Sequence, residues 1–313
     1  MSALASTGAR ATLLLTAVVM LALPAASLRS QTVAVPGTPI DVGQLRERLH
    51  DYLRTYESLL GEVVAVERMT QRAGVMQFGD PIAGSRNLPR TLESDVAFVG
   101  LPGGVGWLGY RDVLRVNGRP TRRAGPSLSA LLSLQNGDAT DRARALLFAG
   151  AIHNLGAPRT INLPSLPLEF LHPRNAGRLT LSPSQPADTT RGACRGRQLD
   201  LVETLRPTLI QRPLGGDMPS RLSAWVEPES GRLCRAEVRT RDASAGDGGF
   251  EAVVAVDLSH DAAVDLTVPT RMREEFFVAP LGRGTSEATY GSYRRFRTSG
   301  RMLPPGPGLP GPR

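Results

Sequence analysis

The amino-acid sequence predicts an α+β protein in which a curved antiparallel β-sheet, open as a half-barrel, packs over two to four helices. The main observation is the second half of the chain, where short runs rich in β-branched residues follow one another from residue 178 onward, separated by Gly, Pro, Ser and Asp. A second observation is the segment 41–60, whose apolar residues repeat at helical spacing. We therefore expect a single α+β domain over residues 41–298, followed by a Pro- and Gly-rich disordered tail at 299–313.

The N-terminal residues have the pattern of a secretory signal peptide. Arg10 precedes the apolar run 11–23, and the small residues 25–27 follow it, so we expect cleavage after Ser27. The apolar run of about thirteen residues is shorter than the roughly twenty that a membrane-spanning helix needs, which favours cleavage. The alternative to cleavage is an uncleaved N-terminal anchor. Residues 1–27 are thus predicted as signal peptide and 28–40 as a disordered leader. The protein is predicted to be exported, periplasmic or extracellular, with no integral membrane span after cleavage.

The first element of the domain is an amphipathic helix at 41–60. Asp41 is a suitable N-cap residue, and Gly61 is a residue type that ends helices. The polar face carries mixed charges, which is typical of a solvated surface. We expect this helix to lie against the sheet and to be followed by a strand at about 62–72, where β-branched residues are concentrated.

Two strands and a tight turn are predicted next, after a Gly- and Pro-rich loop at 73–90. The strands cover 95–101 and 107–116. The pair Asn117-Gly118 favours a type I′ turn, because both central positions of that turn need positive φ. The chain is therefore expected to reverse there into a short strand near 120–123.

Helices interrupt the strands in the middle of the chain. Helical patterns are predicted at 127–135 and 139–155, and the second has so little polar circumference that we expect it to be buried. The Pro-rich stretch 159–173 is predicted as an ordered loop with a short helix. Further strands are expected at 178–182, 196–206, 208–212, 222–227, 232–240, 250–258, 264–278 and 286–298.

The chain has a net charge of +8, and every basic residue is an arginine. Two interpretations are open: a surface for anionic partners, because guanidinium groups match phosphate and carboxylate geometry, or a GC-rich genome in which Arg codons replace Lys codons. The arginines are mixed with acids and only 5 % of the residues are aromatic, so no stacking surface for nucleic acid is evident. We expect no nucleic-acid partner.

Cys194 and Cys234 are the only cysteines in the sequence. An even number in an exported protein most simply indicates one disulfide bond, which here would close a loop of about forty residues and stabilise the fold by roughly 4 kcal/mol. A metal site is disfavoured, because two distant cysteines with no adjacent histidine supply too few ligands. No phosphate-binding or dinucleotide motif occurs, so we expect neither a metal nor a cofactor.

No catalytic constellation stands out. Among the histidines, only His172, in Leu-His-Pro, lies in a setting where a functional role is plausible. The alternative is a buried imidazole that forms a hydrogen bond with the loop backbone. The Gly-x-Ser-x-Gly motif of a serine nucleophile is absent. Glu274 and Glu275 are adjacent on a predicted strand, so they point to opposite faces and do not suit acid–base partnership. We assign no catalytic residue and predict a protein that is not an enzyme.

Four polar residues flank the first predicted strands: Arg90, Asp95, Arg111 and Asp112. They could converge on one site, or they could form separate ion pairs at the sheet edge, which is the commoner arrangement of such residues.

Six aromatic residues are the candidates for a ligand cavity. They fall on the predicted sheet and helices, where core packing is the default interpretation. If the sheet curls only partway round the helices, the same side chains line an apolar cavity of the kind that binds lipid. They are Phe98, Trp107, Tyr110, Phe148, Phe170 and Trp225.

The order of elements resembles the periplasmic lipoprotein-carrier superfamily (LolA/LolB-like). The resemblance rests on the segments 60–63, 116–119, 225–233 and 268–272, and it covers most of residues 41–298. The chain also resembles uncharacterised secreted bacterial proteins, in segments like 111–113, 170–173 and 206–209. The resemblance implies a half-open barrel that covers an apolar cavity with helices.

The sequence hypothesis is therefore a non-enzymatic exported binding protein whose apolar cavity holds an acyl chain or an apolar peptide. Its expected partner is a lipid, or a lipidated or apolar peptide. One alternative is an envelope interaction or sensor module with an envelope protein as its partner, which the arginine excess motivates. The other is an unrecognised hydrolase that uses His172 with a distant acid.

Overall fold

The computed structural model describes residues 41–61, 63–73, 88–100, 107–121, 147–156, 159–183, 195–212, 216–242, 249–279 and 282–295. The predicted signal peptide, leader and tail lie outside these residues. So do the predicted helix 127–135 and most of the predicted loop 73–90.

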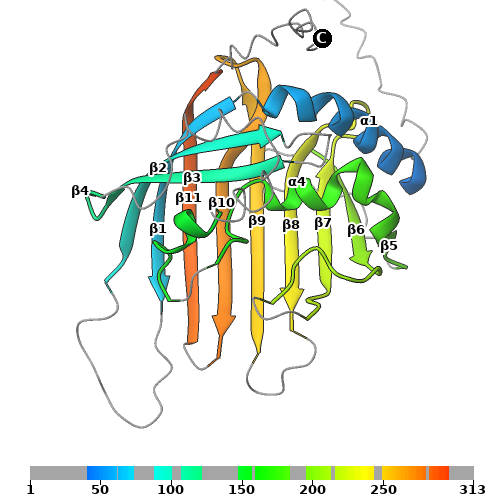
Figure 1. Cartoon of the computed structure of the whole chain (residues 1–313). Coiled ribbons are helices and arrows are strands. Elements are labelled where there is room, and N and C mark those ends of the chain that lie inside the picture. The colour runs from blue at the N-terminus through cyan, green and yellow to red at the C-terminus, as the bar shows by residue number, and fades with distance from the viewer. Residues whose placement is uncertain are drawn as a thin grey trace, which may run out of the picture. The chain divides into compact units, whose positions relative to one another are not determined.

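The strands form one antiparallel sheet of 11 strands in the order β4-β3-β2-β1-β11-β10-β9-β8-β7-β6-β5 (Figure 1). β1 pairs with β11, so strands from the two ends of the domain lie side by side within the sheet. The sheet has two edges, β4 and β5, and does not close into a barrel. The strands are β1 (Val63–Ala73), β2 (Arg90–Gly100), β3 (Trp107–Val116), β4 (Arg119–Pro120), β5 (Leu179–Leu181), β6 (Arg197–Glu203), β7 (Ser220–Val226), β8 (Leu233–Arg241), β9 (Phe250–Asp261), β10 (Leu266–Val278) and β11 (Gly282–Arg295).

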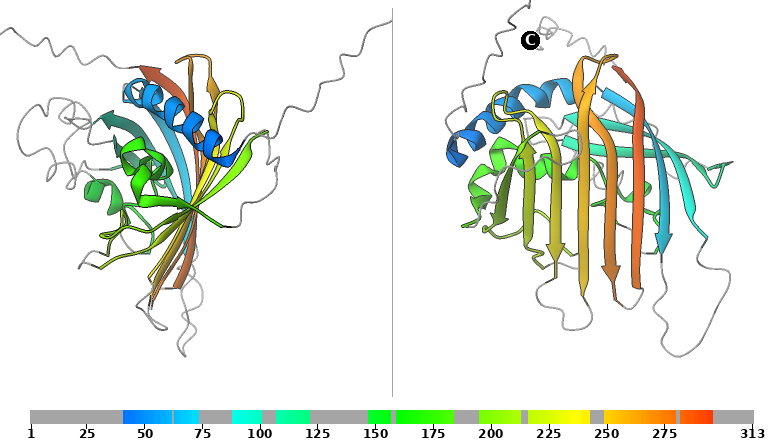
Figure 2. Two further views of the ribbon diagram at one scale, coloured as in Figure 1. Left: turned by 90° about the vertical axis from the view of Figure 1, so that its right-hand side faces the viewer. Right: turned by 180° about the vertical axis from the view of Figure 1, so that it is seen from behind.

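The described helices lie on one face of the sheet, which we call the inner face (Figure 2). Helix α1 (Val42–Leu60) contacts β2 and β10, and the short helix α4 (Leu166–Leu171) contacts β8 and β9. The 3-10 helix η2 (Pro173–Arg178) leads directly into β5. This arrangement is the predicted α+β architecture, a curved antiparallel sheet with few helices. No helix in the described ranges is long and apolar enough to span a lipid bilayer.

The core is built from inner-face residues that oppose one another across the strands. One such row runs from β2 to β6, and each of its side chains is at most 1 % exposed. Helix α1 covers the sheet with Leu45, Leu49 and Leu53, which recur every four residues and are fully buried. Burying each leucine stabilises the fold by about 1.5–3 kcal/mol. The row consists of Leu92, Met69, Ala288, Met272, Val256, Ala236, Ala224 and Leu199.

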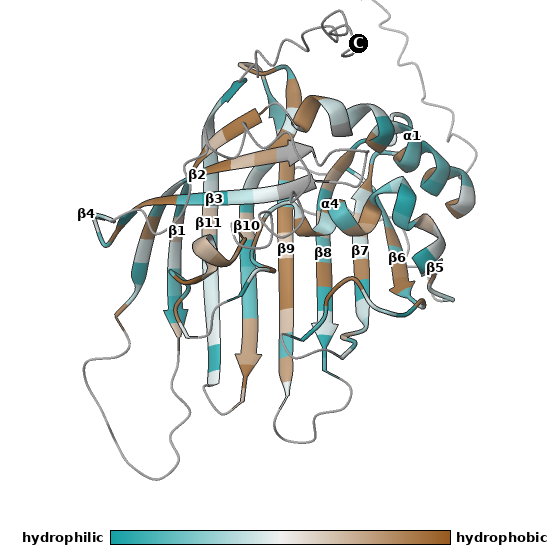
Figure 3. Ribbon diagram, viewed as in Figure 1, coloured by the Kyte–Doolittle hydropathy of each residue, from teal (hydrophilic) through white to brown (hydrophobic). Residues whose placement is uncertain are grey.

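The next inner-face row changes character halfway across the sheet. From β6 to β9 it is apolar, and Figure 3 shows β9 as a mostly hydrophobic strand. From β10 to β1 the row is polar. This row of the inner face therefore has an apolar half and a polar half, as we call them below, that meet between β9 and β10. The apolar members are Leu201, Leu222, Val238 and Val254, and the polar members are Glu274, Ser286 and Gln71.

Backbone geometry explains one predicted turn and one further turn. Asn117 and Gly118 both have positive φ, at 50° and 74°, which confirms the type I′ turn between β3 and β4. In the β7–β8 hairpin, Gly231 has φ of 70°, and an added Cβ would clash with the carbonyl oxygen of Arg48 on α1. The Arg48 guanidinium in turn donates a 2.6 Å hydrogen bond to the carbonyl oxygen of Pro228. The hairpin is therefore locked to the helix.

Two strand predictions need correction. β2 begins at Arg90 and not at 95, because residues 90–97 pair with β1 in antiparallel register, from Gln71 back to Val64. The predicted strand 208–212 is an irregular loop with a single bridge between Gln211 and Asp217. The Asp217 carboxylate accepts hydrogen bonds from the main-chain N–H and the hydroxyl of Thr208, which favours a turn over a strand.

The expectation that helix 139–155 is buried is wrong for the part that the structure describes. Residues 147–151 are helical, but Phe148 and Ile152 are 49 % and 52 % exposed. The reason is the small residue Gly150, where an added Cβ would lie 3.0 Å from the carbonyl oxygen of Arg111 on β3. The segment turns this small side to the sheet, which leaves its large apolar side chains facing outward.

Candidate functional site on the inner face of the sheet

Two carboxylates occupy inner-face positions that strand alternation would otherwise give to apolar residues. Glu67 lies between Ala65 and Met69 on β1, and Glu274 lies two residues after Met272 on β10. Both glutamates are 0 % exposed. Because a buried charge is costly unless it is paired, each carboxylate needs a partner close by.

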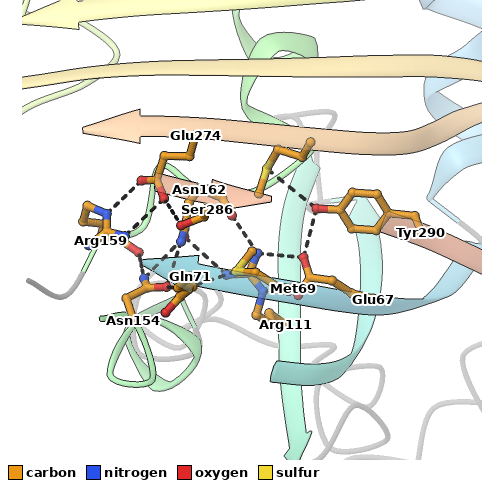
Figure 4. Close-up of polar contacts among 11 residues, drawn as sticks. Glu67, Met69, Gln71, Arg111, Asn154, Arg159, Asn162, Glu274, Ser286 and Tyr290 are labelled. Carbon is orange, nitrogen blue, oxygen red and sulfur yellow. Dashed lines mark hydrogen bonds and ion pairs between the residues drawn. The ribbon is translucent and has the colours of Figure 1, made fainter. Parts of the chain in front are cut away.

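Glu67 is paired within the sheet. Arg111 of β3 donates to it through Nε at 2.6 Å and Nη2 at 2.8 Å, and the Tyr290 hydroxyl of β11 donates to Glu67 Oε1 at 2.9 Å (Figure 4). Burial is the largest single effect and would lower the pKa of Arg111, but the Glu67 charge and the hydrogen bonds with Glu67, together with the weaker influence of Tyr290 and Glu274, raise it. Burial, and then the Glu67 charge, hold the pKa of Tyr290 well above its usual value. The pair is a fixed part of the sheet.

Glu274 is paired with a residue outside the sheet. Arg159 donates to it through Nε at 2.8 Å and Nη2 at 3.1 Å, and Ser286 of β11 donates its hydroxyl at 2.8 Å. The guanidinium carbon of Arg159 lies 3.6 Å from the centroid of the Phe276 ring, a cation–π contact. Both side chains of the Arg159–Glu274 pair are at most 2 % exposed.

Arg159 belongs to a segment that lies over the polar half, and we call residues 147–156 and 159–163 the cover segment. Gln71 of β1 donates to the side-chain oxygen of Asn154 at 2.9 Å, and Arg111 donates to the main-chain oxygen of Asn162 at 2.7 Å (Figure 4). Asn162 and Asn154 also bond each other at 2.7 Å. The cover segment is thus attached to the sheet by hydrogen bonds, an ion pair and a few apolar contacts, among them the packing of Ile161 against the core.

The cover segment lies close to the strands below it. A Cβ at Gly109 of β3 would clash with the hydroxyl of Ser165, and the void between β3 and the cover segment has a volume of about 10 Å³. Such a void holds about one water molecule. With the cover segment in this position, the void offers no room for a larger ligand.

The chemistry of this site is that of charge pairing. Each carboxylate faces a guanidinium group in bidentate geometry, the strong form of this contact. In the part of the chain that the structure describes, no three or more His, Cys, Asp or Glu side chains are grouped so that they could hold a metal ion. What the arrangement does is hold the cover segment on the sheet.

The six aromatic candidates do not gather round one described pocket. Phe98 and Phe170 are fully buried in the core, whereas Tyr110 and Trp225 are buried on the face of the sheet opposite the core. Phe148 is half exposed on the cover segment, and the side chain of Trp107 lies outside the described residues. A cavity lined by Phe98, Trp107, Tyr110, Phe148, Phe170 and Trp225 stays a prediction.

The structure gives His172 a structural contact. Its Nδ1 accepts a hydrogen bond from the main-chain N–H of Arg174 at 3.1 Å, and its side chain thereby caps η2. Cys234 lies on β8, and no described cysteine is free. Cys194 lies outside the described residues, so the Cys194–Cys234 disulfide stays a prediction.

The predicted polar cluster does not converge. Arg111 points to the inner face and pairs with Glu67, whereas Asp95 pairs with Arg294 of β11 at 2.9 Å. Arg90 donates to the main-chain oxygen of His153 in the cover segment at 3.1 Å. Glu274 and Glu275 do point to opposite faces, with Glu274 buried and Glu275 exposed, as strand alternation predicts.

The outer face of the sheet carries many charged side chains. One cross-strand row over β2, β1, β11, β10, β9 and β8 is mostly charged, with the uncharged Thr289 between two arginines, and its members are Glu93, Arg68, Thr289, Arg271, Asp257 and Arg235. Two shallow hollows of about 400 and 660 Å³ lie on this face and share Arg72. Each is lined by three arginines and two glutamates, so neither hollow is strongly basic.

Sequence reasoning missed Glu67, Arg159, Asn154 and Asn162 as members of one site. A signal for Glu67 exists, because it shares strand parity with Val63, Ala65 and Met69 and therefore had to be buried. No local pattern marks the three cover-segment residues.

Comparisons with known proteins are limited to fold similarity. No protein-family model matches the sequence, and no curated protein matches it. Among solved structures, the chain is similar to a LolA superfamily protein from Nitrosomonas europaea, with a TM-score of 0.33 and 10 % identity over 82 % of this chain and 94 % of the other. It is also similar to a DUF1329 family protein from Desulfovibrio piger, with a TM-score of 0.32 and 13 % identity over 81 % and 91 % of the two chains.

Proposed function

We propose that this protein is a non-enzymatic exported binding protein that takes up an acyl chain or an apolar peptide segment at the inner face of its sheet. The observation that carries the proposal is the division of that face. An apolar half, which includes Val254, lies directly beside a polar half, and the cover over the polar half is attached by polar contacts.

The type of attachment decides which part can move. Helix α1 is held by fully buried leucines, and moving it would expose them to water. The cover segment is held by one ion pair, a few apolar contacts and hydrogen bonds, and each hydrogen bond is worth only about 0.5–1.5 kcal/mol net, because water replaces it on release. Displacement of the cover segment would uncover the polar half as far as its border at Val254, and an apolar chain would enter there, beside α4, which covers β8 and β9.

The paired charges support a binding role over a catalytic one. A general base or nucleophile must be available to a substrate, whereas Glu67 and Glu274 both receive a bidentate guanidinium. His172 serves as a helix cap. The hydrolase alternative therefore has no supporting geometry among the described residues.

Export is supported by the sequence of residues 1–27 and by the cysteine pair. Intact-mass analysis of the protein from the bacterial envelope tests both. The expected chain begins after Ser27 and carries an oxidised Cys194–Cys234 pair. A chain that keeps residues 1–27 and two free thiols would contradict export.

Native mass spectrometry of the protein purified from an envelope fraction tests the binding function. We expect a co-purifying apolar ligand that organic extraction releases. Val254→Thr on the inner face should weaken rebinding of the extracted ligand, whereas Val253→Thr, on the outer side of the same strand, should not. A protein that carries no ligand and rebinds none would overturn the proposal.

The outer-face hollows favour a second candidate, an envelope interaction or sensor module. Arg68 and Arg72 line the larger hollow and can meet an anionic partner, whereas Arg271 in the same hollow is paired with Glu287. Binding of this kind is screened by salt over about 10 Å at 0.1 M ionic strength. A partner captured from envelope extracts should therefore dissociate at high salt and be lost in Arg68→Gln, and salt-insensitive capture would count against this candidate.

A further inference from the structure

We propose that Glu274, Phe276 and Ser286 form a subsite for a cationic group of the ligand, which Arg159 of the cover segment occupies in this structure. The inference rests on the proposed binding function and names the ligand class more closely: a guanidinium or ammonium group attached to an apolar chain. Arg159 is then an internal competitor of the ligand.

The subsite is built from strand residues and is complementary to a cation. The Glu274 carboxylate is 0 % exposed and is oriented by the Ser286 hydroxyl at 2.8 Å. The Phe276 ring supplies a π-face 3.6 Å from the bound guanidinium carbon. A carboxylate beside an aromatic face is the typical environment for recognising a cation.

Glycines hold the Phe276 ring in place. Gly284 of β11 lies opposite Phe276, and an added Cβ there would clash with the ring. Gly156 of the cover segment, with φ of 86°, lies at the other side, where an added Cβ would be 3.5 Å from the ring. The ring therefore lies flat against β11 and presents its face to the guanidinium.

The distribution of charges between the sheet and the cover segment indicates the sign of the ligand. Glu67 and Arg111 both belong to the sheet, so their pair persists when the cover segment moves. Arg159 leaves with the cover segment, and Glu274 then has no hydrogen-bonded guanidinium, because Arg111 is bound to Glu67 and acts on Glu274 only at longer range. Arg90 lies on the same row but three strands away, about 14 Å at normal strand spacing, so it cannot replace Arg159.

The surroundings of the subsite indicate an apolar attachment. On the β9 side, Glu274 lies opposite Val254 and Phe276 lies opposite Ala252, both of which are 1 % exposed. A cationic group bound at Glu274 would therefore place the chain that carries it beside Val254, at the border of the apolar half and next to α4. An anionic head group would instead face the Glu274 carboxylate at the same position and be repelled.

Calorimetric titration with four chain-matched amphiphiles tests the inference: n-decylguanidinium, n-decylammonium, n-decanol and n-decanoate, each below its critical micelle concentration. We expect the two cations to bind at least about tenfold more tightly than decanoate, as one charge-assisted contact allows. The net charge of +8 would favour decanoate, so a cationic preference cannot come from the overall charge.

Variants assign the preference to the subsite. Glu274→Gln should abolish it, whereas Glu275→Gln, which removes the same charge from the exposed outer side of the same strand, should retain it. Arg159→Gln should strengthen cation binding, because the internal competitor is gone. If Glu274→Gln does not fold, the double variant Arg159→Gln/Glu274→Gln removes both charges together and should bind all four compounds without preference.

The outcomes separate this inference from the proposed function. Equal binding of all four amphiphiles, or tighter binding of decanoate, would overturn the cationic subsite and leave the binding function standing. Retention of the preference in Glu274→Gln would also overturn it. If none of the four compounds binds, the proposed function fails and the subsite fails with it.

Discussion

Removal of the Arg159 guanidinium tests how the cover segment is held. In Arg159→Met, Glu274 keeps only the Ser286 hydroxyl as a donor. If the cover segment stayed closed, a buried carboxylate without its partner would cost about 3–5 kcal/mol. If it opens, Glu274 is hydrated and the cost is the loss of a few hydrogen bonds, about 0.5–1.5 kcal/mol each. Because the cheaper route prevails, we expect a loss of roughly 2–4 kcal/mol, with the cover segment released.

A double-mutant cycle in urea, with Arg159→Met, Glu274→Met and both together, measures the coupling. The double variant should return to within about 1 kcal/mol of the parent, because an apolar pair of similar volume can replace a buried ion pair. Hydrogen exchange should show faster exchange over residues 150–163 in the single variant only. Additivity of the two single substitutions within about 0.5 kcal/mol would refute the coupling and with it the described attachment.

Three further predictions address the scaffold. Leu49→Ala should destabilise the fold by about 2–5 kcal/mol in urea unfolding, because Leu49 is fully buried. Leu59→Ala, on the exposed side of α1, should cost under about 1 kcal/mol. Equal costs would contradict the packing of α1 on the sheet. At Gly118 an added Cβ has open space, so Gly118→Ala should cost only the strain of positive φ, about 1–2 kcal/mol. Gly231→Ala should cost more, because its Cβ would also clash with the α1 backbone. The reverse order of stability in thermal unfolding would contradict the contact between the hairpin and α1. Burial raises the pKa of Glu203, so the charge of Glu203 opposes folding at neutral pH. Glu203→Gln should therefore raise the free energy of unfolding at pH 7, and this gain should vanish as the pH falls below about 4.5. A lower free energy of unfolding at pH 7 would contradict the prediction.

Much of the sheet could be predicted from the sequence because its signals are local. Alternation of Arg235, Glu237 and Arg239 with Ala236 and Val238 predicts opposite faces of β8 for the charged and the apolar residues, and the structure confirms it, although Glu237 is buried rather than exposed to water. The opposite orientations of Glu274 and Glu275 follow from the same two-residue period. The curved α+β sheet over a few helices was therefore predictable.

The pairing of β1 with β11 has no local signal, because it joins residues more than two hundred positions apart in the sequence. The site depends on this pairing, since Gln71 of β1 meets Ser286 of β11 on the inner face. The partner of Glu274 was equally hidden, because Arg159 lies in a Pro-rich stretch without regular structure. Periodicity describes elements, whereas the site consists of contacts between elements.

Photo-crosslinking tests the central claim, that an apolar chain binds at the inner face, most directly. A decylammonium probe with a diazirine at the end of its chain would be irradiated with the purified protein, and the labelled peptides would be sequenced. The account predicts labels on inner-face residues of the apolar half, such as Leu222, Val238 and Val254. Labels confined to the outer face, or spread evenly over both faces, would contradict it.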